Sequence, residues 1–81
     1  MFNRGDLLSL DDGIKYFVAD IFHDMGRIFL TLSNYDEPEK LKFCILKEDK
    51  LIEIQNPKLI EYVAKKSYSN LHKKEILDNL F

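Results

Sequence analysis

Short connections between strand-like segments are the feature that most constrains the fold of this chain. Four turn signals interrupt the first 54 residues, at positions 11–13, 23–26, 34–39 and 48–50. None of these connections is long enough to hold the helix that normally joins two parallel strands. Consecutive strands must therefore pair antiparallel, as a meander.

The five segments between the turns carry strand patterns. They alternate between apolar and polar positions or are rich in β-branched and aromatic residues, and they span 6–10, 14–22, 27–33, 40–47 and 51–54. Strict alternation in the second segment places Tyr16, Val18, Asp20 and Phe22 on one face. Both faces of this segment are largely apolar, which favours a central strand in a strongly bent or barrel-like sheet.

The chain changes character after residue 55. Asn56 followed by Pro57 is a helix start signal, because Asn caps the first free N–H groups and Pro fits the first turn. Serines at 67–70 predict a break, with Ser69 as the cap of a second helix. We therefore expect a single α+β domain over residues 1–81. It would consist of a five-stranded antiparallel meander over about 6–54, as a bent sheet or SH3-like barrel, followed by one or two helices over about 56–81.

Composition excludes several classes of protein. The chain has 81 residues, of which 46% are hydrophobic, so it can build a compact core and is not expected to be disordered. Its single cysteine, Cys44, excludes an internal disulfide and a cysteine-based zinc site, and we expect it to be a buried small hydrophobe. No signal-peptide pattern and no apolar run of about 20 residues is present, so the expected location is the cytoplasm.

Acidic residues near the start of the chain are the first candidates for chemistry. Asp11 and Asp12 stand before Gly13, and Asp20 follows. Asp-Gly between two strands is a strong hairpin signal, with positive φ expected at Asp12 and Gly13. The calcium-loop spacing is missing, so we interpret the stretch as a turn.

The other polar residues offer no catalytic or metal constellation. His23 and Asp24 are adjacent in a turn, Cys44 lacks a nearby base, and three glycines cannot form a phosphate-binding loop. The sequence predicts no catalytic residue, no metal ligand and no cofactor, and hence a protein that is not an enzyme.

Two surfaces are candidates for binding. The first is apolar and would meet another protein or a second subunit, unless its C-terminal part docks on the sheet and completes the core; its residues are Phe29, Ile76, Leu77, Leu80 and Phe81. The second combines lysines with aromatic rings, a composition that suits nucleic acid; its residues are Lys58, Lys65, Lys66, Lys73, Lys74, Tyr62 and Tyr68. Residues 1–39 hold three basic residues against eight acids, whereas residues 40–81 hold nine lysines against six acids.

The layout of residues 4–54 resembles that of small β-meander proteins of unknown function from Gram-positive bacteria and phages. The resemblance rests on RGDLLSLDDGIKYFVAD, in which a Gly-Asp pair leads a strand and a Leu-x-Asp-Gly hairpin leads to Tyr-x-Val, and on GRIFLTLSNYDEPEKLKFCIL. It implies an SH3-like or open meander sheet and a phage or mobile-element origin, and it brings no catalytic residues. The helical part has no counterpart in it.

These observations lead to one expected function and one alternative. We expect a small non-enzymatic interaction or regulatory protein that binds an unidentified protein partner or itself. The alternative is a nucleic-acid-binding protein that uses the lysine-rich helical part.

Overall fold

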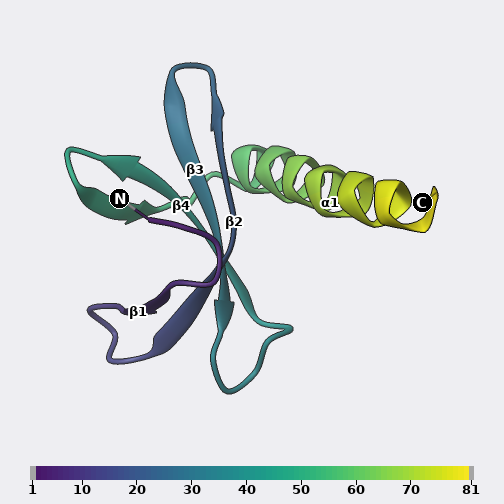
Figure 1. Ribbon diagram of the computed structural model, residues 1–81. Helices are drawn as coiled ribbons and strands as arrows, with labels where there is room; N and C mark the ends of the chain where they lie inside the picture. The colour runs from purple at the N-terminus through teal and green to yellow at the C-terminus, as the bar shows by residue number, and fades with distance from the viewer. Residues whose placement is uncertain (1, 81) are drawn as a thin grey trace.

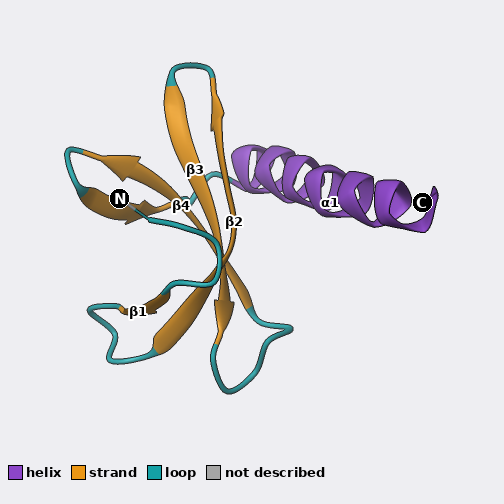
Figure 2. Ribbon diagram, in the orientation of Figure 1, coloured by secondary structure: helices purple, strands orange, loops and turns teal. Residues whose placement is uncertain are grey.

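The computed structural model describes residues 2–80, with side chains described for residues 2–70. Five strands precede one helix (Figures 1 and 2). The elements are β1 (Leu7–Ser9), β2 (Lys15–Asp24), β3 (Arg27–Asn34), β4 (Leu41–Lys47), β5 (Lys50–Glu53) and α1 (Pro57–Leu80).

The strands form one antiparallel sheet in the order β1-β2-β3-β4-β5. The sheet twists strongly and curls into a half-barrel, with β1 and β5 as its two edges (Figure 1). This architecture confirms the predicted α+β meander. The short connections explain it, because each strand can reach only its neighbour in sequence.

Two of the turns have the positive φ angles that a two-residue hairpin requires. Met25 and Gly26 both have positive φ, as do Glu48 and Asp49, so the β2–β3 and β4–β5 connections are two-residue type I′ turns. The β1–β2 turn is different. The N–H of Gly13 donates to the Leu10 carbonyl at 2.9 Å, and among residues 10–14 positive φ occurs only at Gly13. This is a three-residue loop, and the expected positive φ at Asp12 was wrong.

A β-bulge in β2 corrects the predicted faces of that strand. Val18 pairs with Leu32 and Asp20 pairs with Thr31, so Ala19 is the extra residue. The bulge moves the alternation by one position, and Tyr16 and Val18 therefore share a face with Ile21, not with Asp20 and Phe22.

The two faces of the sheet carry separate cores. The inner face of the half-barrel buries an apolar cluster centred on Val18, Leu30, Leu32 and Cys44. The other face buries Phe29 and Ile54 against Val63 of α1.

One continuous helix replaces the predicted break at 67–70. The Asn56 side chain caps its start as predicted, accepting hydrogen bonds from the N–H groups of Lys58 (2.9 Å) and Leu59 (3.4 Å). Ser67 is buried and bonds to the sheet, and Ser69 lies within α1 and starts no second helix. The first half of α1 packs on the sheet and its C-terminal end extends beyond it (Figure 1).

Candidate functional site

The bulge in β2 places a carboxylate beneath the helix. Ala19 and Asp20 both face α1, and Asp20 has no exposed surface. Its side chain accepts a hydrogen bond from Arg4 at 2.7 Å and one from Asn70 of α1 at 3.4 Å. Burying a carboxylate is costly unless it is paired, and this contact satisfies Asp20 while tying the N-terminal segment and the helix to β2.

A second polar contact joins the helix to the centre of the sheet. The hydroxyl groups of Thr31 on β3 and Ser67 on α1 lie 2.6 Å apart, and both residues are buried. Such a bond satisfies two groups that would otherwise be buried without partners. These two polar contacts fix the position of α1 on the sheet.

An apolar groove lies next to these contacts, between α1 and the sheet. It has a volume of about 480 Å³ and is lined by Ala19, Thr31, Leu41, Phe43, Ala64, Lys65, Ser67 and Tyr68. Alanines stand on both walls, Ala19 on β2 and Ala64 on α1. Their short side chains leave the space between helix and sheet unfilled, so the surface is hollowed where apolar groups gather.

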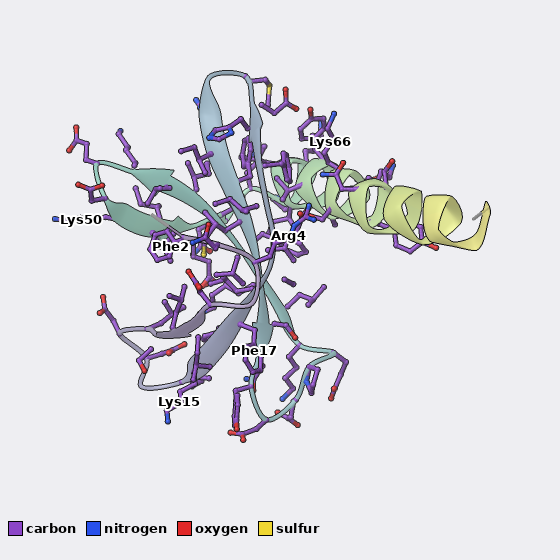
Figure 3. The ribbon with its side chains drawn as sticks, viewed as in Figure 1. Phe2, Arg4, Lys15, Phe17, Lys50 and Lys66 are labelled. Atoms are coloured by element: carbon purple, nitrogen blue, oxygen red, sulfur yellow. The ribbon has the colours of Figure 1, made fainter. Side chains whose placement is uncertain are left out.

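The apolar surface continues from the groove along the uncovered part of the same sheet face. Phe17 and Leu41 both flank Ser33 in neighbouring strands, because Ser33 pairs with each of them. Leu41 is 53% exposed, and the ring of Phe17 lies 5.3 Å from that of Tyr35, which is also exposed. Figure 3 shows Phe17 well away from α1, on the part of the sheet that the helix leaves open.

One residue of the predicted protein interface is buried in the structure. Phe29 is 0% exposed and packs with Ile54 and Val63 under the helix, so it belongs to the core and offers no surface to a partner. The reason is that β3 is central and buried on both faces. The other residues of this prediction, Ile76, Leu77, Leu80 and Phe81, lie outside the residues whose side chains are described.

The structure places the predicted nucleic-acid residues on α1, and among those with described side chains Lys65 and Tyr68 line the apolar groove. Lys58, Lys65 and Lys66 are exposed, and Lys65 pairs with Glu61 at 2.9 Å. The Tyr62 hydroxyl donates to Asp24, a bond that raises the pKa of Tyr62. Tyr68 borders the apolar groove. Lys73 and Lys74 lie outside the described side chains.

In the acidic β1–β2 turn, Asp12 accepts several hydrogen bonds. The carboxylate of Asp12 accepts hydrogen bonds from the Ile14 N–H at 2.9 Å, the Tyr16 hydroxyl at 3.2 Å and Lys42 at 3.1 Å. The Ile14 N–H is the main cause that lowers the pKa of Asp12. Burial opposes the charge of Lys42, but bonds to Asp12 and Glu53 together raise the pKa of this lysine. These bonds give Asp12 a structural role in the turn that the sequence predicted.

The remaining candidates for chemistry are dispersed. Cys44 is buried in the inner core, and burial raises the pKa of its thiol to about 11, which makes it a poor nucleophile.

Among the described residues no group of three or more His, Cys, Asp or Glu side chains is arranged to hold a metal ion. In the same part of the chain no helix is both long and apolar enough to cross a membrane.

Sequence reasoning missed the groove and the buried carboxylate. The burial of Asp20 could have been inferred, because an acidic residue inside an apolar strand must be paired if it is buried. The groove itself could not have been inferred from Ala19 and Ala64, because a small residue lines a groove only when another element lies opposite it.

Comparison with known proteins found no matching protein family, no matching curated protein and no matching solved structure. The resemblance to Gram-positive and phage proteins stays a prediction from the layout of the sequence.

Proposed function

We propose that this protein is a small non-enzymatic interaction module that binds a partner protein through the groove beside α1. The observation that carries the proposal is the apolar surface that the helix leaves uncovered. Phe17, Leu41 and Tyr35 are exposed there, next to a hollow of about 480 Å³. Exposed apolar surface of this kind around a concave site is typical of protein contacts.

The partner that suits this groove presents a large apolar side chain. Phe43 and the two alanines form an apolar lining, and Lys65 is the only charged residue that lines the groove within the described part of the chain. An apolar anchor would gain burial there without leaving a buried charge unpaired.

The experiment is quantitative capture of the tagged full chain from its native extract, with and without nuclease, read by mass spectrometry. Leu41→Glu should lower recovery of a specific protein about tenfold or more, because it places a charge in the contact. Ile52→Glu is the matched control, since Ile52 is exposed to a similar degree, 49% against 53%, on the same sheet face but does not line the groove. Equal loss or equal recovery in both variants would remove the groove as the binding surface.

The nuclease arm tests the alternative. Phosphate contacts through Lys58 and Lys66 would make capture sensitive to nuclease and to salt. Retention of the partner under both treatments would favour protein binding.

A further inference from the structure

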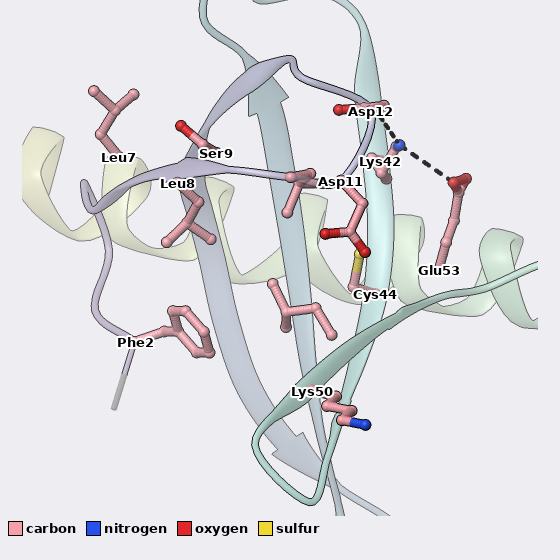
Figure 4. A pocket seen from close by; sticks show the side chains of 12 residues that line it. Phe2, Leu7, Leu8, Ser9, Asp11, Asp12, Lys42, Cys44, Lys50 and Glu53 are labelled. Atoms are coloured by element: carbon pink, nitrogen blue, oxygen red, sulfur yellow. Dashed lines mark hydrogen bonds and ion pairs between the residues drawn. The ribbon is translucent and has the colours of Figure 1, made fainter.

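A second cavity lies on the opposite face, inside the half-barrel. It has a volume of about 730 Å³ and opens between β1 and β5 (Figure 4). Its apolar wall is formed by Phe2, Leu8, Leu10, Cys44 and Leu51. We call this opening the seam.

Both edges of the seam present backbone groups that no strand pairs. The N–H of Leu10 donates to Ile14 and that of Val18 donates to Asp6, so the hydrogen-bonded positions in β1 alternate and include Leu8. The backbone groups of Leu7 and Ser9 therefore point away from β2, into the seam.

The same reasoning applies to β5. The N–H of Ile54 donates to Phe43, so Ile52 is a hydrogen-bonded position and the backbone groups of Leu51 and Glu53 point outward. All four outward-facing residues line the cavity. Within the described residues, no backbone hydrogen bond outside the strand ladders involves any of the four.

Strand direction explains why the seam stays open. Each strand is antiparallel to the next, so β1 and β5 run in the same direction. With five strands a meander cannot close by an antiparallel pair. One further strand, antiparallel to both edges, would close it and satisfy both rows of backbone groups.

Charged side chains mark one end of the seam. Lys42 reaches Asp12 of the β1–β2 turn at 3.1 Å and Glu53 of β5 at 3.3 Å (Figure 4). The Lys42 ammonium also lies 5.1 Å from the centre of the Tyr16 ring. This network bridges the two edges and limits the seam to a short extended segment.

We propose that the seam binds an extended peptide segment of a partner protein as a sixth strand, antiparallel to β1 and β5, with apolar side chains at alternate positions facing the inner core. The backbone groups on both edges select an extended main chain, and the apolar wall selects every second side chain. This proposal goes beyond the groove beside α1, since it concerns the other face of the sheet.

The test uses the full chain and a phage-displayed library of random linear peptides of about ten residues. Selected peptides should share apolar residues at every second position. In NMR hydrogen exchange, a selected peptide should slow exchange of the Leu7, Ser9, Leu51 and Glu53 amides about tenfold or more, while the Ile52 amide, already paired, changes little.

Proline substitution tests the edge directly. Ser9→Pro removes one outward N–H without touching the β1–β2 ladder and should weaken peptide binding about tenfold, whereas Ser9→Ala keeps the N–H and should stay within about twofold. If Ser9→Pro fails to fold, Leu7→Pro removes the other outward donor at the first residue of the strand.

Three outcomes would overturn the proposal. They are unchanged binding to a folded proline variant, a selection that yields no alternating peptides, and peptide-induced amide chemical-shift changes confined to Ala19, Leu41 and Ala64, which would place the peptide in the groove. A fourth outcome that would overturn it is edge protection that rises with protein concentration in the absence of peptide, which would assign the seam to a second copy of the chain. Leu41→Glu should leave seam binding unchanged, which separates the two surfaces.

Discussion

At the scale of residues, single side chains set the strength of the turns and of the contacts between layers. Asp12 shows this most clearly, because one carboxylate serves a backbone N–H, a phenol and an ammonium group on three segments. The sequence indicated a turn there, and the structure adds that the turn is joined to β4. Asp12 therefore stabilises the turn itself and also joins the turn to β4.

The lowered pKa of Asp12 makes stability depend on pH. A carboxyl group with a lower pKa in the folded state stabilises that state above its unfolded pKa, and loses this effect as pH falls through the folded value. We expect Asp12→Asn to flatten the loss of stability between about pH 5 and about pH 2, measured by urea unfolding. Asp11→Asn removes the same charge one residue away and should retain the wild-type acid dependence. An identical acid limb in all three proteins would contradict the role assigned to Asp12.

At the scale of elements, hairpin geometry conflicts with residue type most strongly in the β4–β5 turn, where both central residues are non-glycine with positive φ. Glu48 and Asp49 occupy left-handed positions that favour Asn and Gly. We expect Glu48→Asn with Asp49→Gly to raise the free energy of unfolding by about 1 kcal/mol, measured by urea denaturation. The reason is that the backbone strain is relieved while the register stays the same.

Gly26 supplies the reciprocal control. A Cβ added there meets nothing within 4 Å, so Gly26→Ala changes only backbone strain at a φ of +70°. It should lower stability by about 1 kcal/mol. Opposite signs in the two turns would establish the type I′ geometry, whereas equal signs would reject it.

At the scale of the whole molecule, the helix is joined to the sheet by a few specific contacts. Thr31 and Ser67 form one of them, buried between the layers. Thr31→Val and Ser67→Ala should each cost about 1–2 kcal/mol, because each leaves the other hydroxyl buried without its partner. The double variant should cost no more than either single one. Additive losses in denaturant unfolding would show that the two hydroxyl groups stabilise the protein independently.

Tertiary packing also determines which of the predicted binding residues are exposed. Phe29 looked like an exposed apolar residue because its neighbours Arg27, Thr31 and Ser33 are polar. Helix α1 covers that row of the sheet, so Phe29 became core and the open surface moved to Phe17 and Leu41. The choice depends on where a distant segment packs, which strand periodicity does not encode.

The sequence by itself determined the number of strands, their antiparallel order and the start of the helix, because turn residues, short connections and the Asn56-Pro57 cap act over a few neighbouring positions. The tertiary structure alone decided the bulge at Ala19, the burial of Asp20, the continuity of α1 and the two concave surfaces. These features come from contacts between segments far apart in the chain. There, packing and the pairing of buried polar groups outweigh local preference.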